Sequence, residues 1–151
     1  MIKLAIYGGN MEKMSRLENK ANDLLVKCEH MALTSVNDEG YPRTCMISKA
    51  KADDFMSIYF ATGKSDAKQS KVTHFEKCSK ASVCFTKEFD SVTLVGDVEI
   101  VDDMELKKEL WKESFHTFFK EGVEDPAYTI LRFKTNEATF WINDEFQTNT
   151  Y

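Results

Sequence analysis

Apolar and polar residues alternate along much of this chain with a period of two, which is the pattern of half-buried β-strands. The clearest segment alternates Ala81, Val83 and Phe85 with small or polar neighbours. Gly96 lies in the middle of the longest such stretch and predicts a bulge or bend. Strands are predicted at residues 31–36, 41–49, 55–62, 80–86, 91–101, 128–134 and 138–142. Turn-forming residues separate several of them, at residues 37–40, 52–54 and 135–137.

Elsewhere the apolar residues recur at spacings of three and four, which is typical of amphipathic helices. Residues 11–29 form the first predicted helix. A later helix is predicted from a capping box, in which Asp102 caps and Glu105 reaches back, to about Lys120. Gly122 is expected to end it. Residues 66–77 form a short helix between these two.

Tight turns join most of the strands, and few β-α-β units are present, so a barrel or a sandwich is favoured over a doubly wound sheet. The predicted class is mostly β with flanking helices. Residues 11–151 are read as one domain, and residues 1–10 as a lead-in whose order the sequence leaves open. A small closed barrel fills its interior with side chains, so a ligand is expected outside it or at a subunit boundary.

The net charge of −5 argues against general affinity for nucleic acid or an anionic membrane. No apolar run approaches the length of about 20 residues that spans a bilayer. The four cysteines form no C-x-x-C pair, and His30, His74 and His116 are scattered, so no metal site is expected. Free thiols suggest a cytoplasmic protein. His74 is expected to face solvent and to play no catalytic part.

A β-type run that ends at Thr62 is followed by Gly63 and a cluster of Lys, Ser and Asp residues. If a helix begins directly afterwards, capped by Ser65 or Asp66, its free N–H groups face outward and form an anion site. Residues 61–80 hold five lysines against two acidic residues, a local balance of +3 in an acidic chain. Lys64, Lys68 and Lys71 can supply this charge to a small phosphorylated ligand. The alternative interpretation is a solvated helix face.

Several short motifs follow one another in a characteristic order. They are Gly40-x-Pro42-Arg43-x-x-Met46, Tyr59-Phe60-x-Thr62, Lys64-Ser65-x-x-Lys68, Ala81-Ser82-Val83-Cys84-Phe85 and Phe140-Trp141. This order resembles the FMN-binding split-barrel superfamily related to pyridoxamine 5′-phosphate oxidase, and within it the general stress protein 26-like branch. The likeness covers about residues 14–143. It implies a six-stranded antiparallel split β-barrel and a homodimer with FMN at the subunit boundary.

The resemblance also implies a set of FMN-binding residues. Arg43 would be the basic residue near the flavin, and Thr44, Cys45 and Met46 would lie along the isoalloxazine ring. The ribityl and phosphate end would be lined by Tyr59, Phe60, Ala61 and Thr62, and the phosphate held by Ser65 and Lys68. Trp141, and with it the Trp111 region, would approach the flavin from the partner subunit. Each residue also has a simpler interpretation, with Arg43 on the surface, Met46 and Trp141 in the core, and Trp111, Phe115 and Phe118 as a packing stripe.

The expected activity is that of an FMN-dependent oxidoreductase, which uses NAD(P)H or another donor on a small-molecule acceptor. No side chain stands out as an acid or base, so no catalytic residue is assigned. Residues 142–151 contain no arginine or histidine that could grip a second phosphate, which argues against pyridoxamine phosphate oxidase activity. The alternatives are a non-catalytic flavin-binding or flavin-sensing stress protein, a haem or deazaflavin binder of the same fold, and an interaction domain without flavin.

Overall fold

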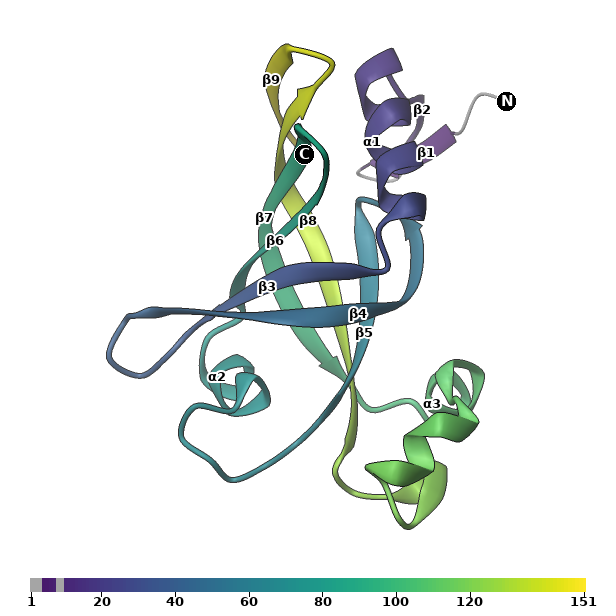
Figure 1. The fold of residues 1–151 in the computed structure, drawn as a ribbon, viewed down its shortest axis with the longest axis vertical. Coiled ribbons are helices and arrows are strands. Elements are labelled where there is room, and N and C mark those ends of the chain that lie inside the picture. The colour runs from purple at the N-terminus through teal and green to yellow at the C-terminus, as the bar shows by residue number, and fades with distance from the viewer. Residues whose placement is uncertain (1–3, 8–9) are drawn as a thin grey trace.

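The computed structural model describes residues 4–7 and 10–151 (Figure 1). Its strands are β1 (Leu4–Tyr7), β2 (Asn10–Lys13), β3 (His30–Val36), β4 (Pro42–Asp54), β5 (Ser57–Gly63), β6 (Lys80–Lys87), β7 (Asp90–Val101), β8 (Tyr128–Ile142) and β9 (Glu145–Thr150). Its helices are α1 (Arg16–Lys27), α2 (Lys71–Lys77) and α3 (Met104–Leu110), with 3-10 turns η1 (Glu113–Thr117) and η2 (Gly122–Glu124).

Six strands close into an antiparallel barrel in the order β5-β4-β3-β6-β7-β8, because β5 also pairs with β8. β9 extends the sheet beyond β8, and β1 and β2 form a separate hairpin. The prediction of a mostly β, six-stranded antiparallel barrel is therefore confirmed. The prediction for residues 1–10 falls partly outside the described residues.

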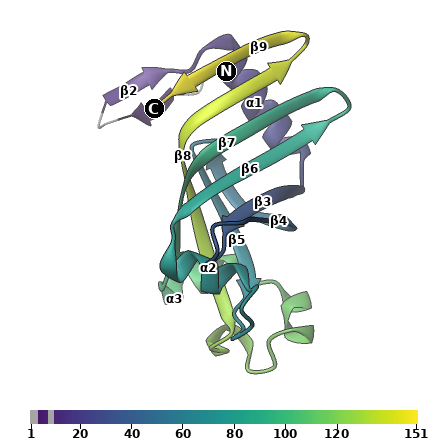
Figure 2. The same ribbon diagram turned by 90° about the vertical axis from the view of Figure 1, so that its left-hand side faces the viewer.

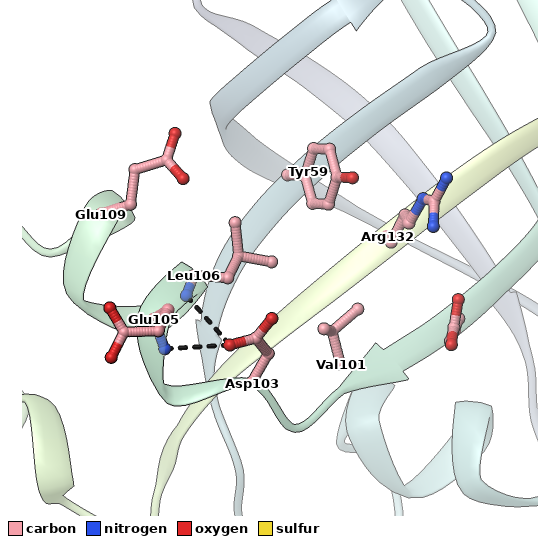
Figure 3. A pocket seen from close by; sticks show the side chains of 8 residues that line it. Tyr59, Val101, Asp103, Glu105, Leu106, Glu109 and Arg132 are labelled. Atoms are coloured by element: carbon pink, nitrogen blue, oxygen red, sulfur yellow. Dashed lines mark hydrogen bonds between the residues drawn. The ribbon is translucent and has the colours of Figure 1, made fainter.

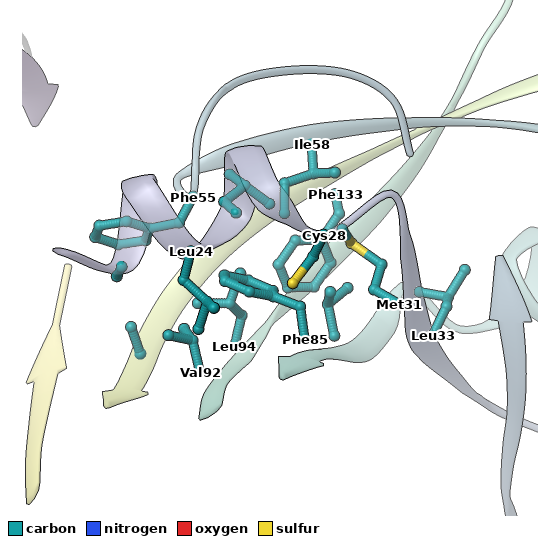
Figure 4. Close-up of a cluster of buried hydrophobic side chains, with 14 of the residues drawn as sticks. Leu24, Cys28, Met31, Leu33, Phe55, Ile58, Phe85, Val92, Leu94 and Phe133 are labelled. Atoms are coloured by element: carbon teal, nitrogen blue, oxygen red, sulfur yellow. The ribbon is translucent and has the colours of Figure 1, made fainter. Parts of the chain in front are cut away.

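Buried residues alternate with more exposed ones along β3, β5, β6 and β7, as the sequence predicts, whereas Ile47 is the buried residue of β4. Figure 4 shows the resulting cluster, in which Phe85, Leu94 and Phe133 pack together beneath α1. Leu24 of α1 enters the same cluster. Figures 1 and 2 show α1 toward one end of the molecule and α3 toward the other. Because the interior is filled with side chains, a ligand must bind outside it.

The first helix is shorter than predicted, because residues 11–13 belong to β2. The helix begins after Ser15, whose hydroxyl accepts a hydrogen bond from the Glu18 N–H, while the Glu18 carboxylate accepts one from the Ser15 N–H. This capping box sets the start of the helix after Ser15, although the apolar spacing had predicted a start at residue 11. At the other end, Lys49 Nζ donates to the Leu25 carbonyl at 2.6 Å.

Two predicted turns are wrong because strand pairing continues through them. β4 runs to Asp54, and the turn falls at residues 55–56. β8 runs unbroken through residues 135–137 because β7 pairs with it along its length. The bulge at Gly96 is confirmed by a register shift, and any Cβ there would collide with the carbonyl of Lys134. The strand β9 was not predicted.

The helical predictions after residue 60 are also corrected. α2 begins at Lys71, so residues 64–70 form a loop, and the anion site expected at a helix start beside Ser65 does not exist in that form. The predicted helix of residues 102–120 divides into α3 and η1. Its cap is Asp103 rather than Asp102, since Asp103 Oδ1 accepts hydrogen bonds from two N–H groups of the first turn.

Candidate functional site

The barrel is split between β4 and β5. These strands pair only between Lys49–Asp54 and Ser57–Phe60, after which they diverge. The preceding part of β4, residues 42–48, pairs with β3, and among the described residues it has no strand on its other side. Since unpaired strand edges carry free N–H and C=O groups, the split offers a row of hydrogen-bonding sites.

Hydrogen-bond direction shows which peptide groups face the split. The Lys49 N–H donates to the Glu29 carbonyl at 2.8 Å, on the β3 side. Because N–H directions alternate along a strand, Thr44, Met46 and Ser48 direct their peptide groups toward β5. On the facing strand, the Lys64 N–H donates to the Ala127 carbonyl at 2.7 Å, next to β8. The same alternation turns the peptide groups of Ala61 and Gly63 toward β4.

A cavity of about 630 Å³ lies along this split. It is lined by Glu29, Met46, Ile47, Ser48, Lys49, Ala50, Ala61, Thr62, Gly63, Lys64, Lys71, Lys112, Ser114, Phe115, Phe118, Phe119 and Ala127. A hollow of about 390 Å³ adjoins it and shares Gly63 and Lys71. Its other lining residues are Ser35, Arg43, Thr44, Cys45, Ser65, Ala67, Gln69, Ser70 and His74. We call the two together the split cleft, whose size is that of a cofactor site.

The lysines near the cleft differ in how their charge is used. Lys68 Nζ lies 2.7 Å from Glu39, a contact that raises the pKa of Lys68 and lowers that of Glu39. Lys64 forms an ion pair with Glu76, which raises its pKa in the same way. Lys71 Nζ donates instead to Thr62 Oγ1 at 3.1 Å and, among the described residues, has no carboxylate partner. Lys71 is therefore the best placed to neutralise an anion.

His74 does not face solvent, which corrects the prediction from sequence. Its ring is 2% exposed, with Nδ1 2.7 Å from Ser35 Oγ and Nε2 3.1 Å from the Lys68 carbonyl. A nitrogen that bonds a carbonyl must donate, so Nε2 carries a proton in this arrangement. The ring thus ties the loop of residues 64–70 to β3, beneath the cleft. The predicted helix included His74 but gave the wrong exposure for it, because helical spacing does not show that the loop of residues 64–70 covers the ring.

Most of the residues predicted to bind a ligand meet in the split cleft: Arg43, Thr44, Cys45, Met46, Ala61, Thr62, Lys64 and Ser65. Met46 is 68% exposed, so it is not a core residue. The Phe60 side chain is fully buried inside the barrel, and Phe60 does not line the cleft. Lys68 points toward Glu39, at the edge of the loop.

Tyr59 lies in a separate hollow of about 510 Å³ beside α3 (Figure 3). The Arg132 guanidinium sits 5.8 Å from the centre of the Tyr59 ring, and Arg132 Nε lies 3.4 Å from Ser57 Oγ. The carboxylates there are engaged, since Asp103 caps α3 and Glu109 pairs with Lys51 at 2.8 Å. The structure therefore does not bring Tyr59 into the split cleft.

The two tryptophans also lie apart from the cleft lining. Trp111 packs against Phe115, Phe119 and Tyr128 with ring centroids 5.1–6.3 Å apart, behind the cleft wall. Phe118, expected in the same stripe, is instead 76% exposed. Trp141 is on β8, pairs with Ser91 and Phe146, and does not line the cleft of its own chain.

Part of the cleft wall comes from residues that the sequence does not single out as ligand-binding. Lys112, Ser114, Phe115 and Phe118 reach it because the chain leaves α3 and turns back as η1 toward Gly63. An added Cβ on Gly63 would lie 3.6 Å from Phe119 Cε1, so the two segments are in close contact. No local signal separates this arrangement from one long helix, whereas in the structure Phe115 and Phe119 pack against Tyr128 on β8.

The closed six-stranded barrel with one opened seam defines this chain as a split-barrel protein. The chain belongs to the family described as pyridoxamine 5′-phosphate oxidase like, whose pattern it matches over residues 14–150. A search of curated proteins found no match. Among solved structures, a protein related to general stress protein 26 of B. subtilis, from Clostridium acetobutylicum, is 23% identical with a TM-score of 0.77, covering 89% of this chain and 94% of that one.

Two further structures of this fold have names that mention a ligand. A pyridoxamine 5′-phosphate oxidase-related, FMN-binding protein from Nostoc punctiforme is 14% identical, with a TM-score of 0.62 and coverage of 87% of this chain and 91% of that one. A haem-binding protein from Mycobacterium smegmatis is 10% identical, with a TM-score of 0.69 and coverage of 91% and 59%. At such identities the likeness shows the fold alone.

Two searches of the described residues gave negative results. They contain no group of three or more His, Cys, Asp or Glu side chains arranged to hold a metal ion. They also contain no helix long and apolar enough to cross a membrane.

Proposed function

We propose that this protein binds FMN in the split cleft and acts as an oxidoreductase. The observation that carries the proposal is the two-sided cleft itself. Among the described residues, it has peptide groups of β4 and β5 without a strand partner and, at one end, a lysine without a carboxylate partner. A flat heterocycle with polar edges needs peptide donors and acceptors along its rim. Its phosphate needs cations and hydroxyl groups.

The residues present fit this cofactor. Thr44, Met46 and Ser48 would address the ring edges through their peptide groups, and the exposed Met46 side chain would cover one face. Ser65 and Lys71 would hold the phosphate, with His74 fixing the loop beneath it. When bound, FMN would supply hydride and electron transfer between a donor such as NAD(P)H and a small-molecule acceptor.

The chain's own residues supply orientation and exclusion of water rather than acid–base chemistry. Phe115 and Phe118 form an apolar wall on one side of the cleft. Arg43 at the mouth places positive charge where it would favour a reduced, anionic flavin. No side chain in the cleft is assigned as a general acid or base, so the proposed chemistry is that of the cofactor.

The homodimer that completes this proposal has a suitable surface. Three outward-facing residues from each of β4, β3, β6, β7, β8 and β9 form a continuous sheet face. They are Thr44, Met46, Ser48, His30, Ala32, Thr34, Ser82, Cys84, Thr86, Ser91, Thr93, Val95, Glu137, Thr139, Trp141, Phe146, Thr148 and Thr150. Its one carboxylate is Glu137, in a chain with 30% charged residues. A face so poor in charge favours contact with a second copy.

This surface, which we call the neutral face, also explains how Trp141 could serve the site. Met46 and Thr44 lie at its β4 edge beside the cleft, whereas Trp141 and Phe146 lie on β8 and β9. In a two-fold dimer, each surface patch meets its counterpart, so residues remote from the cleft of one copy can approach that of the other. The cofactor would then lie at the subunit boundary.

Classical pyridoxamine phosphate oxidase activity is not part of the proposal. Residues 145–150 form β9, whose acidic residue Glu145 is paired with Arg16 of α1. Residues 142–151 contain no arginine or histidine. A second phosphate-bearing substrate would therefore find no cation on this terminal strand.

Titration of the apoprotein with FMN tests the proposal. Saturable binding with a shifted flavin spectrum is expected, followed by NAD(P)H consumption when FMN is present. FMN binding without turnover would favour a flavin holder. A Soret band on haem titration, with no FMN binding at tens of micromolar, would replace the proposal by a haem-binding function. The latter needs an axial ligand, and both ring nitrogens of His74 are already engaged.

A further inference from the structure

One ion pair joins the tip of the β3–β4 hairpin to the loop of residues 64–70. Glu39 lies in this tip, and its Oε1 is 2.7 Å from Lys68 Nζ. The two residues are 29 apart in the sequence, so only the folded chain brings them together. The contact lowers the pKa of the Glu39 carboxyl and raises that of Lys68, because each charge stabilises the other. Lys68 is therefore occupied by a carboxylate of its own chain.

The backbone on both sides of this ion pair is held in place. The Glu39 N–H donates to Asn37 Oδ1 at 3.0 Å, within the hairpin tip. The Lys68 carbonyl accepts a hydrogen bond from His74 Nε2 at 3.1 Å, which ties the loop to α2. Because both backbone segments are fixed, we expect the contact to open by rotation of the two side chains. Both side chains are free to rotate, since that of Lys68 is 63% exposed and that of Glu39 57%.

Lys68 lies beside the hollow in which the phosphate of FMN is proposed to bind. Its own side chain does not line the hollow, because it points to the hairpin tip. Ala67 and Gln69, on either side of it in the chain, do line the hollow. A lysine ammonium group sits on a flexible stem of four carbons. Lys68 Nζ can therefore turn from the hairpin toward an anion in the hollow without any movement of the loop.

We propose that Glu39 makes an autoinhibitory contact, in which it occupies Lys68 in the free protein and is displaced by the phosphate of FMN. An exposed ion pair is weak, whereas a charge-assisted bond to a phosphate is strong, so the phosphate wins the exchange. The inference rests on the proposed function, because the competing anion is taken to be that of FMN. It adds the regulation of the site: Glu39 lowers the affinity for FMN and not that for riboflavin, which has no phosphate.

Glu39→Gln tests the contact, because it removes the charge and keeps the shape of the side chain. FMN should bind about threefold more tightly to this variant than to wild type, since the competing ion pair is lost. Riboflavin should bind equally to both. Fluorescence titration at low ionic strength measures both ligands, because salt screens exposed charges.

Asp38→Asn is the matched control. Asp38 lies in the same hairpin tip, but it pairs with Lys77 of α2 at 2.8 Å. Its removal therefore relieves a similar long-range repulsion of the phosphate without releasing Lys68. The affinity for FMN should stay close to that of wild type.

A double-mutant cycle with Lys68→Ala separates displacement from repulsion. In the Lys68→Ala background, Glu39→Gln should bring no gain in FMN affinity, because no lysine is left to be released. Long-range repulsion by Glu39 would instead be relieved in both backgrounds. The inference is overturned if Glu39→Gln brings no gain in the native background, if Asp38→Asn brings an equal gain, or if the gain persists without Lys68.

The proposed function and the autoinhibitory contact fail in different ways. If FMN does not bind to wild type or to Glu39→Gln, the proposed function is removed. Inorganic phosphate is then titrated into both proteins, with binding followed by the NMR signals of the loop of residues 64–70. Tighter binding of phosphate by Glu39→Gln would support the competition for Lys68, and equal binding would overturn it.

Discussion

Lysines near the split differ in their contacts, although they carry the same charge. Lys64, Lys68 and Lys71 look alike in the sequence, yet two of them pair with carboxylates and the third has no carboxylate partner among the residues that the structure describes. Exposed ion pairs contribute little to stability, so these pairs can open when a ligand arrives. Lys71 can bind an anion without first breaking an ion pair.

A comparison of Lys71→Ala with Lys68→Ala tests whether Lys71 contributes more than Lys68 to binding the phosphate. Lys71→Ala should weaken FMN about tenfold and leave riboflavin unchanged, because a charge-assisted bond to the phosphate is lost and riboflavin has no phosphate. Lys68→Ala should have a smaller effect on FMN, since Lys68 is held by Glu39. Fluorescence titration measures both ligands. Equal losses for FMN and riboflavin would show that the phosphate does not bind here.

Gly96 is the residue whose lack of a side chain matters most to the barrel. Gly96→Ala should lower the free energy of unfolding by about 3 kcal/mol, because the new Cβ would press on the Lys134 carbonyl at the bulge. Chemical denaturation measures the loss. Gly63→Ala is the control, since its Cβ would meet Phe119 at an ordinary contact distance. A Gly96→Ala protein as stable as the control would contradict the bulge geometry.

At the scale of elements, caps and strand pairing decide where each segment begins and ends. The capping box at Ser15 starts α1 after the pattern had suggested an earlier helix. Pairing with β7 carries β8 through residues with turn preferences. The break after α3 follows from the packing of Trp111 on Tyr128. The capping box is itself a local contact, between residues three apart, whereas in the other two cases a contact between distant segments accompanies the departure from a local preference.

The cap of α3 gives a direct test at this scale. Asp103→Ala should lower the free energy of unfolding by about 1 kcal/mol, because two first-turn N–H groups lose their acceptor. Asp102→Ala should change it by less than about 0.5 kcal/mol, since that side chain is exposed and its contact with Lys107 is 3.9 Å. Thermal or urea unfolding of the two variants compares them. The reverse order would restore Asp102 as the cap.

At the scale of the whole molecule, two surfaces of the barrel are specialised. The split cleft exposes peptide edges and lysines, and the neutral face presents small polar and aromatic side chains with one carboxylate. The two surfaces meet at Thr44 and Met46 of β4. This adjacency links the proposed cofactor site to the proposed dimer contact.

The neutral face is tested by placing a charge on it. Val95→Lys should shift the protein from dimer to monomer, because an interface core tolerates an unpaired charge poorly. Val26→Lys is the matched control, since Val26 is exposed on α1 and lies off this face. Sedimentation velocity gives the molecular mass of each variant. If wild type is a monomer, or if Val95→Lys stays dimeric, this face is not the interface.

Local periodicity determined the strands of the barrel and most of its inward-facing residues, because alternation depends on which side of a strand faces the core. It also placed Arg43, Met46, Thr62 and Ser65 on segments that meet at one cleft. The resemblance supplied the order of the strands and the closed barrel. The strands and their inward-facing residues could be predicted because they depend on neighbouring residues. The strand order could be predicted because the motifs follow one another in a characteristic order.

Only the tertiary structure decided which charges are free and which ring is buried. Within the described part of the chain, Lys71 bonds Thr62 and has no carboxylate partner, and His74 lies under a loop, because of the segments that fold beside them. The width of the split depends on where β5 leaves β4 to follow β8, which no local pattern encodes. The sequence alone thus determined the strands, whereas contacts between distant segments decided the shape and charge of the cleft.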